Sequence, residues 1–583
     1  MVTARRTAGA MLSLLLGALF IAPQAFGHQP PPSDEPDSLP IRQALEPPLL
    51  PTPEADCGPG SRPETGVQGR VSRAEHESGR AAAGYTCNTE QIGRYGKETP
   101  LGTVGGFKVE RYVDAAGHEC AYYDTTLMYP TNIFDEEAGV NVLEMSDPAD
   151  PKLTDRLLTP AMLSPHESLV LSEERGILAA VAGNAGFAPG IVDVYDVSAD
   201  CRHPVLRSTT PVGVFGHESG MAPDGRTFYS ASPATETIVA VDIADPTRPV
   251  PLWYGNYDSH GLSISSDGNR AYVAGVDSGL IILDVSEIQD RVPNPSVREI
   301  ARLQWESMSI PQNAIPITVK GHPYLVEIDE YGGTQSTGGK IGAGRIIDIG
   351  DEAAPRVISN LRLGVHQPEN LAEAQHDPGA ELPVQGYGGH YCNVPDRTDP
   401  GIVACSMILS GLRVFDIRDP EDPSEIAYFN APIPKRDSPG FEASNWAMSS
   451  PAFVPDRNEI WYSDGYSGFY AVRLTNDAWP ANGGDGGRGC NRVAGTRGKD
   501  RIRGTAGADC IRGRAGPDRL LGAGGGDRIR GGLGPDTIRG GAGDDVILAA
   551  RGGRDRVDCG PGDDSVAAKR GKDRLRRCEH VRG

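Results

Sequence analysis

Aspartate recurs at a nearly fixed spacing toward the C-terminal end of this 583-residue chain. Seven of the eight intervals between successive members are nine residues long, and one is ten. Glycine stands two residues before each aspartate, and Ile, Leu or Val stands two residues after it. Glycine-rich turns let carbonyl and carboxylate oxygens crowd together, and Ca²⁺ prefers such oxygen ligands. The sequence therefore predicts a row of calcium ligands at Asp500, Asp509, Asp518, Asp527, Asp536, Asp545, Asp555, Asp564 and Asp573.

The nine-residue period also predicts the structure that carries these ligands. Residues 495–576 resemble the RTX family of calcium-binding nonapeptide repeats, known from hemolysin-type proteins. The resemblance implies a parallel β-roll in which two repeats form one coil, so that nine repeats give about four and a half coils. It also implies several bound Ca²⁺ ions. The alternatives are a disordered glycine-rich tail and a solenoid that folds without metal.

Two features depart from the regular repeat. Lys499, Arg554 and Lys572 stand directly before three of the aspartates, where a cation opposes binding of Ca²⁺. We therefore expect weaker binding at the end repeats and at Asp555 than at the repeats from 509 to 545. The ten-residue interval between Asp545 and Asp555 is expected to break the register, which would divide the roll into two pieces.

Histidine recurs in the preceding part of the chain, each time at the start of an apolar segment. The four histidines are His166, His217, His260 and His390, and Gln312 stands at the equivalent place in another copy. If each begins the first strand of a propeller blade, the imidazoles converge on the central channel. Three or four imidazoles there could bind Zn, Cu or Fe. The alternative is that each histidine hydrogen-bonds the neighbouring blade.

Glutamates follow two of these histidines, at Glu167 and Glu218. Adjacent residues of a strand point to opposite faces, so the two members of a His–Glu pair are not expected to face the channel together. Catalytic residues stay unknown, because no nucleophile elbow, phosphate-binding glycine loop or dinucleotide fingerprint occurs.

The elements that would position the histidines form a repeated theme between about residues 100 and 480. An alternating apolar strand ends in aspartate and an Asp-Pro turn often follows, in copies at 140–148, 191–198, 238–246, 280–286, 345–349, 412–420 and 469–474. A two-strand lead-in precedes each copy, and four short strands per repeat, with turn residues between them, form one unit. Seven units predict an all-β chain with a seven-bladed β-propeller over 85–480, followed by the C-terminal parallel β-roll. An irregular array of β-sandwiches is the alternative.

This theme resembles the LVIVD-repeat β-propeller proteins of bacteria, with a start at 105–124 like that of secreted members. The resemblance implies the propeller fold but supplies no catalytic residues. Glu144 and Arg473 replace the strand-end aspartate in the first and last copies. Elsewhere the strand-end aspartates are expected to cap the turn that follows, at Asp196, Asp242, Asp284, Asp348 and Asp416. Arg345, Arg413 and Arg473 lie within strands and are expected to face solvent.

The N-terminal region and the cysteines indicate export. Residues 1–27 combine an arginine pair, an apolar stretch and a small-x-small site, as in a signal peptide, with a membrane anchor as the alternative. The ten cysteines are even in number, which favours disulfides in a secreted or extracellular protein, with association with the cell surface as an alternative to free release. The expected pairs are Cys392 with Cys405, Cys490 with Cys510, and Cys559 with Cys578. The sequence suggests no pairing for Cys57, Cys87, Cys120 and Cys201.

Composition and charge limit the possible partners. The net charge is −22, yet residues 490–583 hold 21 basic and 13 acidic side chains, a net +8 that leaves −30 for the rest. The acidic balance argues against nucleic-acid binding, whereas the basic tail could dock on an anionic envelope polymer or on the acidic propeller. Residues 28–84 predict a Pro-rich acidic linker and residues 481–494 a Gly-rich linker.

Two functions remain open on the sequence. The first is an extracellular binding, adhesion or scaffold protein whose roll is stabilised by Ca²⁺ and whose propeller binds an unknown extracellular protein. The second is a secreted metal-dependent enzyme that uses the histidine cluster at the channel.

Overall fold

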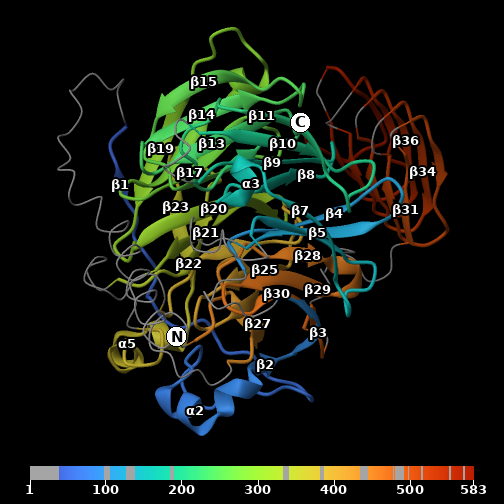
Figure 1. Ribbon diagram of the computed structural model, residues 1–583. Helices are drawn as coiled ribbons and strands as arrows, with labels where there is room; N and C mark the ends of the chain where they lie inside the picture. The colour runs from blue at the N-terminus through green and yellow to red at the C-terminus, as the bar shows by residue number, and fades with distance from the viewer. Residues whose placement is uncertain are drawn as a thin grey trace.

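Seven antiparallel blades arranged in a ring and a separate C-terminal roll make up the protein (Figure 1). The computed structural model describes residues 39–96, 105–125, 138–183, 190–331, 340–380, 386–433, 444–476, 478–479, 491–496, 498–513, 516–532, 534–549, 553–568 and 571–582. The predicted signal peptide at 1–27 and most of the linker at 481–494 lie outside these residues. No helix in the described ranges is long and apolar enough to cross a membrane.

Each blade contains four strands, and sequential strands pair with one another within a blade. Blade one contains β4 (Val109–Val113), β5 (Glu119–Asp124), β6 (Val140–Glu144) and β7 (Lys152–Leu157), and blade two contains β8 (Val170–Ser172), β9 (Ile177–Val181), β10 (Val192–Asp196) and β11 (Val205–Thr210). Blade three contains β12 (Gly220–Met221), β13 (Thr227–Ser232), β14 (Thr237–Asp242) and β15 (Val250–Asn256). Blade four contains β16 (Gly261–Ile264), β17 (Arg270–Gly275), β18 (Gly279–Asp284) and β19 (Arg298–Gln304).

Blade five contains β20 (Ile310–Val319), β21 (His322–Glu330), β22 (Gly344–Asp348) and β23 (Arg356–Leu361). Blade six contains β24 (Tyr391–Asn393), β25 (Ile402–Ser406), β26 (Leu412–Asp416) and β27 (Ser424–Asn430). Blade seven contains β28 (Ala452–Val454), β29 (Glu459–Asp464), β30 (Gly468–Leu474) and β3 (Thr89–Tyr95). Short helices connect or cover them at α2 (Arg73–Ser78), α3 (Pro160–Leu163), α4 (Ser286–Gln289) and α5 (Pro368–Ala374). The predicted seven-bladed propeller is confirmed.

The third strand of each blade is the repeated theme of the sequence. In β14 every residue from Ile238 to Val241 is buried, because the blade is covered on both faces by its neighbours. The strand-end aspartates accept backbone N–H groups two residues on: Asp242 Oδ1 lies 2.9 Å from Ala244 N, and Asp348 Oδ1 lies 2.8 Å from Gly350 N. Asp196, Asp284 and Asp416 make the same contact, so their predicted capping role is confirmed.

A strand from the N-terminal side closes the ring. β3 pairs antiparallel with β30 and forms the outer strand of blade seven, so the two ends of the propeller lie in one sheet. Two further N-terminal strands add to other blades, β1 (Arg42–Gln43) in parallel to β19 and β2 (Tyr85–Cys87) antiparallel to β27. Residues 39–84 thus differ from the expected extended linker, because they lie along the propeller and are held by its strands.

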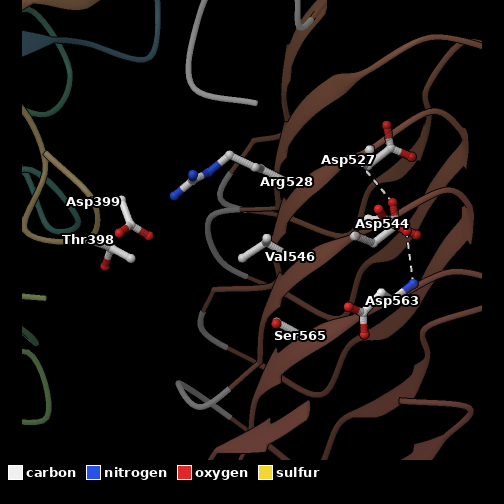
Figure 2. Close-up of a pocket in the computed structure, with 10 residues that line it drawn as sticks. Thr398, Asp399, Asp527, Arg528, Asp544, Val546, Asp563 and Ser565 are labelled. Carbon is white, nitrogen blue, oxygen red and sulfur yellow. Dashed lines mark hydrogen bonds between the residues drawn. The ribbon is translucent and has the colours of Figure 1, made fainter. Parts of the chain in front are cut away.

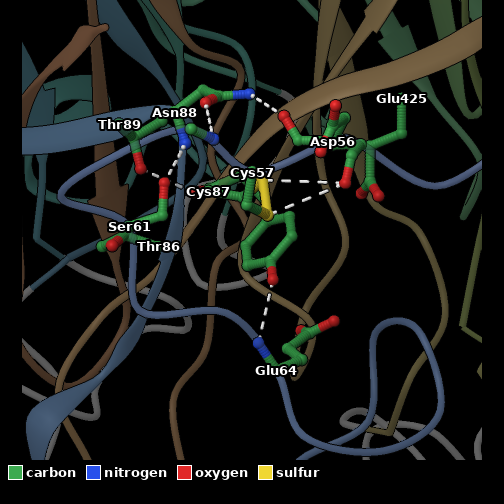
Figure 3. Close-up of a disulfide and its surroundings, with 12 residues drawn as sticks. Asp56, Cys57, Ser61, Glu64, Thr86, Cys87, Asn88, Thr89 and Glu425 are labelled. Atoms are coloured by element: carbon green, nitrogen blue, oxygen red, sulfur yellow. Dashed lines mark hydrogen bonds between the residues drawn. A yellow bond between two sulfur atoms is a disulfide. The ribbon is translucent and has the colours of Figure 1, made fainter. Parts of the chain in front are cut away.

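A disulfide secures this N-terminal segment (Figure 3). Cys57 and Cys87 are bonded, and the hydroxyl of Tyr428 on β27 accepts the backbone N–H of Glu64 at 2.9 Å. The structure also pairs Cys120 with Cys201, and neither bond was suggested by the sequence. Two expected disulfides are present, Cys392–Cys405 and Cys559–Cys578. The third expected pair falls outside the description, because Cys490 and the side chain of Cys510 are not described.

Two arginines expected at the surface lie instead inside the propeller. Arg345 is fully buried, binds Asp329 at 2.9 Å and also Glu327, and stacks on Trp305 with 4.3 Å from its guanidinium carbon to the ring centre. Arg413 is likewise buried against Glu425, at 3.1 Å, and against Glu64 of the N-terminal segment. The expectation was wrong because strand alternation gives no information about these carboxylates. Arg473 is 39% exposed, as expected.

Two parallel sheets form the roll. One contains β31 (Asn491–Ala494), β33 (Asp509–Arg512), β35 (Arg528–Arg530), β37 (Val546–Leu548), β39 (Ser565–Ala567) and β41 (His580–Arg582); the other contains β32 (Arg501–Arg503), β34 (Arg519–Gly524), β36 (Thr537–Ala542), β38 (Arg556–Asp558) and β40 (Arg574–Arg576). Successive strands of a sheet pair 18 residues apart, as Arg501 with Arg519, so two repeats form one coil.

The roll is continuous across the ten-residue interval. Thr537 pairs with Arg556 and Val546 with Ser565, each 19 residues apart, before the 18-residue register resumes at Arg556 and Arg574. The expected division into two pieces is therefore wrong, since one longer coil accommodates the extra residue. The aliphatic residue two positions after each aspartate points inward, and the buried members are Ile511, Leu520, Ile529, Ile538, Ile547, Val557 and Val566.

Candidate metal sites and interaction surface

The aspartates of the roll form a hydrogen-bonded ladder. The backbone N–H of each donates to the Oδ1 atom of the aspartate one coil further on, as from Asp518 to Asp536 at 2.9 Å and from Asp527 to Asp545 at 2.8 Å. Across the longer coil the same bond joins Asp536 to Asp555 and Asp545 to Asp564, both at 2.8 Å. The ladder fixes one carboxylate oxygen of each aspartate. Because the carboxylate is planar, this hydrogen bond also limits the direction in which the second oxygen points.

The second oxygen has no hydrogen-bond partner in most of the ladder. This is true of the buried Oδ2 atoms of Asp518, Asp527, Asp536, Asp545 and Asp564. A buried carboxylate oxygen without a donor is costly unless a cation binds it. Burial first, then the neighbouring aspartates, raises the pKa of Asp536 and of Asp545 to about 7. A bound dication would oppose that rise by favouring the charged carboxylate.

Glycine keeps the space beside these oxygens open. A Cβ atom on Gly522 would lie closer than 3.0 Å to both Asp527 Oδ2 and the carbonyl oxygen of Gly540. The same holds one repeat earlier, where a Cβ on Gly513 would meet Asp518 Oδ2 and the carbonyl oxygen of Gly531. Carboxylate and carbonyl oxygens from two coils therefore face one small space. This oxygen donor set fits Ca²⁺, which these residues would hold between the turns.

The first two aspartates differ from the rest. Asp509 Oδ2 accepts the backbone N–H of Thr505 at 2.5 Å and its hydroxyl at 3.1 Å. Asp500 Oδ2 accepts the corresponding groups of Thr496 at 2.7 and 3.0 Å. Threonine thus supplies the donors that the other repeats lack. Among the predicted ligands, Asp509 therefore resembles the end repeat at Asp500 more than the repeats that follow.

Exposed arginines cover the sheet of β32, β34, β36, β38 and β40. Residues on either side of an inward aliphatic residue point outward, and on this sheet seven of those positions are exposed arginines: Arg501, Arg503, Arg519, Arg539, Arg556, Arg574 and Arg576. Arg501 lies in register with Arg519, and Arg556 with Arg574. Neighbouring parallel strands are about 4.8 Å apart, so these cations follow the roll axis in rows. We call these seven residues the arginine face.

The opposite sheet of the roll faces the propeller, beside which the roll lies in Figure 1. Arg530 on β35 binds Asp396 in the loop between β24 and β25 at 2.9 Å. A hollow of about 390 Å³ separates the two parts, lined by Asp399 and Thr398 of the propeller and by Asp527, Asp544 and Asp563 of the roll (Figure 2). The roll therefore contacts the propeller through one sheet and presents the other to solvent.

The four histidines converge on the propeller axis. His166, His217, His260 and His390 each stand just before the first strand of a blade, β8, β12, β16 and β24. The Nε2 atoms of His166 and His217 are 3.1 Å apart, and the rings of His217 and His260 have centres 4.5 Å apart. His390 reaches the same group through Glu167, whose Oε1 lies 3.5 Å from His390 Nε2.

Glutamates join these imidazoles into one cluster. Glu167 Oε2 lies 2.9 Å from His217 Nδ1. Glu330, at the end of β21, lies 3.3 Å from His260 Nε2 and 3.1 Å from His390 Nε2. Gln312 Nε2 donates to Glu167 Oε2 at 2.5 Å, as does the hydroxyl of Tyr391 at 2.9 Å. We call His166, Glu167, His217, His260, Glu330 and His390 the axial cluster.

Backbone conformation explains why a His–Glu pair can face the channel together. His166 and Glu167 both have positive φ, 41° and 74°, so they form a left-handed turn before β8 and not part of a strand. Strand alternation does not apply there, and the expectation that the pair points to opposite sides was wrong. Two consecutive non-glycine residues in the left-handed backbone conformation are strained, and such strain is concentrated at functional sites.

The electrostatics of the axial cluster are dominated by burial. Burial lowers the pKa of His390 to about 4 and raises that of Glu330 to about 8. Burial also acts to raise the pKa of Glu167, but the facing imidazoles of His217, His390 and His166 hold it well below its ordinary value. Glu218 lies nearby and binds Lys108 at 3.0 Å. Neither Glu330 nor Lys108 was singled out from the sequence, because neither belongs to the recurring histidine pattern.

Comparison with known proteins supports both repeat types. A model of the RTX calcium-binding nonapeptide repeat (4 copies) matches residues 485–520 and 521–553, and a model of the LVIVD repeat matches residues 260–289. The chain therefore carries calcium-binding RTX repeats and an LVIVD repeat in a propeller. No curated protein matches the chain.

Two solved structures are similar to part of it. One is a chain of "Crystal Structure of Mitotic Checkpoint Complex", 11% identical, covering 65% of this chain and 94% of that one with a TM-score of 0.39. The other is a functionally unknown protein from Desulfotomaculum acetoxidans DSM 771, 12% identical, covering 54% and 86% with a TM-score of 0.36. At these scores neither carries a functional argument.

Proposed function

We propose that this is a secreted calcium-binding propeller protein that binds an anionic extracellular polymer through the arginine face of its roll. In this proposal Ca²⁺ holds the coils together and thereby holds the arginines in rows. The protein then acts as an extracellular binding or scaffold module, with the propeller as its second binding part. The arginine face is the observation that carries the proposal.

Four features support it. The buried Oδ2 atoms of the ladder need a cation, and RTX repeats are typical of secreted proteins. Four described disulfides suit an oxidising compartment. The arginine face is turned away from the propeller, whose contact with the roll uses Arg530 on the other sheet. A linear polyanion laid along the roll would meet one or two cations at almost every strand.

Binding of the calcium-loaded full chain to beads that carry a sulfated polysaccharide tests this function. We expect the triple variant Arg519→Ser/Arg556→Ser/Arg574→Ser to elute at lower salt. The slope of log affinity against log salt should fall by about two to three, because fewer counterions are released. The control variant Arg298→Ser/Arg356→Ser/Arg418→Ser removes the same charge from the propeller surface and should elute like the wild type.

Two outcomes would contradict the proposal. One is equal loss of binding in both triple variants, which would indicate an effect of net charge alone. The other is binding that survives deletion of residues 490–583, which would place the polymer on the propeller.

A further inference from the structure

Two buried histidines of the axial cluster have their tautomers fixed by backbone carbonyls. His260 Nδ1 lies 2.7 Å from the carbonyl oxygen of Pro311, and His390 Nδ1 lies 2.7 Å from that of Met448. A carbonyl only accepts, so each Nδ1 carries the proton and each Nε2 carries a lone pair. Metal-binding histidines are commonly oriented in this way by a carbonyl on the other nitrogen.

These lone pairs face carboxylate oxygens. His390 Nε2 lies 3.1 Å from Glu330 Oε2, and His260 Nε2 lies 3.3 Å from Glu330 Oε1. Neither His390 Nε2 nor Glu330 Oε2 makes a hydrogen bond, although both are buried. His217 Nδ1 is in the same position, at 2.9 Å from Glu167 without hydrogen-bond geometry. Acceptor atoms that face one another in this way need a proton or a cation between them.

The distances match a metal coordination shell. Ligand atoms held about 2.0–2.1 Å from one ion are themselves separated by about 2.9 Å at octahedral and about 3.4 Å at tetrahedral angles. The contacts along the axial cluster lie between 2.9 and 3.5 Å, but His217 uses Nε2 toward His166 and Nδ1 toward Glu167, so one ion takes only one of these two nitrogens. One ligand atom each from His166, Glu167 and His217 lies within 4.8 Å of the other two.

We infer that the propeller axis binds a divalent transition metal ion, with His166, Glu167 and His217 as its ligands and His260, Glu330 and His390 packed beside them. Two imidazoles and one carboxylate select Zn, Cu or Fe over Ca²⁺, which prefers oxygen alone. A proton could satisfy one facing pair, whereas an ion would be bound by His166, Glu167 and His217 together.

One side of this site is open. His217 is 16% exposed and His166 is half-buried, while His260 and His390 are 5% and 0% exposed. A small ligand could therefore reach the ion from the His166 side. The opposite side is closed by Tyr391 and Gln312, which donate hydrogen bonds to Glu167 and hold its carboxylate in place.

Metal retention by the full, tag-free chain tests the inference. The protein is kept in calcium so that the roll is loaded, incubated separately with Zn²⁺, Cu²⁺ and Co²⁺, dialysed, and analysed for metal content. We expect about one transition-metal ion per chain in the wild type and at least a tenfold loss in His217→Ala and in Glu167→Gln. The exposed His322, which binds Asp348 at 2.7 Å on blade five, provides the control variant His322→Ala, which should retain the metal.

A second measurement separates ligand loss from misfolding. Glu167→Gln keeps the shape of the side chain and an oxygen that can accept from Tyr391, so it should unfold at the temperature of the metal-free wild type. Added Co²⁺ should give visible d–d absorption in the wild type and in His322→Ala, and none in Glu167→Gln. Retention below one ion in ten chains, or equal retention in wild type and Glu167→Gln, would overturn the inference.

Discussion

One carboxylate oxygen distinguishes the aspartates of the roll from each other. In Asp527 it is buried beside a glycine and has no donor, whereas in Asp509 two groups of Thr505 donate to it. The sequence predicts both as calcium ligands because they occupy the same place in the repeat. Only the structure shows that Thr505 donates to the second oxygen of Asp509, at the place where a cation would bind the second oxygen of Asp527.

Filling the space beside one such oxygen should weaken calcium binding. We expect Gly522→Ala to lower calcium affinity about tenfold or more and to reduce the number of bound ions, because its Cβ would displace Asp527 Oδ2 and the carbonyl of Gly540. Gly507→Ala is the matched control, since the nearest atom to its Cβ would be Thr505 Oγ1 at 4.0 Å. Calorimetric titration with Ca²⁺ measures both. Equal affinity in the two variants would contradict the assigned ligands.

Arg345 shows where the prediction of a residue's environment fails. Its position in β22 is evident from the repeated strand, but its partners Glu327 and Asp329 lie on β21 and Trp305 lies in the connection before β20. No local pattern joins these residues. For the same reason the burial of Arg413 beside Glu64, 349 residues away, could not be predicted from sequence.

Loss of this buried cation should destabilise the propeller. Arg345→Met leaves two buried carboxylates without their cation, so we expect the free energy of unfolding to fall by about 3–5 kcal/mol. The exposed Arg356, which binds Asp348 on the same blade, provides the control Arg356→Met, with an expected change below about 1 kcal/mol. Guanidinium unfolding in calcium measures the difference. Similar changes in both variants would show that burial of the pair does not matter.

At the scale of elements, the periodic parts of the fold could be predicted and the irregular parts could not. The third strands share one sequence theme and the inward aliphatic residues of the roll recur every nine or ten residues, and all of them lie where the pattern places them. Every blade also has a register shift between its third and fourth strands, as between Ala240 and Val241, and no sequence signal marks it. The alternation of a strand likewise does not predict the left-handed turn at His166 and Glu167.

The last coil of the roll depends on a disulfide. Cys559 and Cys578 join positions 19 residues apart, and Glu579 beside them accepts the N–H of Asp564 at 3.0 Å. Replacing both cysteines with alanine should destabilise the calcium-loaded roll by about 3 kcal/mol, because the unfolded chain gains loop entropy. Calcium affinity should fall with it. Replacing Cys392 and Cys405, which lie within one blade hairpin, should leave calcium affinity unchanged, and the opposite pattern would contradict this account.

At the scale of the molecule, stability should depend on pH through a buried histidine outside the metal sites. His366 lies within 2.7 Å of the carbonyl oxygen of Tyr387, and burial lowers its pKa from 6.5 to about 3. The unfolded chain therefore binds a proton that the folded chain does not between pH 6.5 and 3. The stability supplied by this group is complete above pH 6.5 and is lost as the pH falls.

Replacing His366 should remove that dependence. Between pH 6 and 4 we expect the free energy of unfolding of the wild type, compared with His366→Gln, to fall by about 1.4 kcal/mol more per pH unit. Urea unfolding at fixed calcium concentration measures the two slopes. The exposed His203 provides the control His203→Gln, which should follow the wild type. Parallel slopes for wild type and His366→Gln would contradict the assignment.

The charges of the molecule are unevenly distributed, because the propeller is acidic and the roll is basic. The roll also needs a cation to complete its coils. Calcium should therefore act on one part and leave the other unchanged. The seven blades have large aliphatic and aromatic cores between them, and three of the four described disulfides lie in this part, so we expect the stability of the propeller not to depend on the ladder.

Hydrogen exchange of the full chain, followed by mass spectrometry with and without a calcium chelator, tests this most directly. We expect calcium to slow exchange roughly tenfold or more in peptides from residues 516–568, which hold the donor-free Oδ2 atoms of Asp518, Asp527, Asp536, Asp545 and Asp564. Peptides from the blades should exchange equally in both conditions. Exchange in residues 516–568 that is the same with calcium and with chelator would contradict the account.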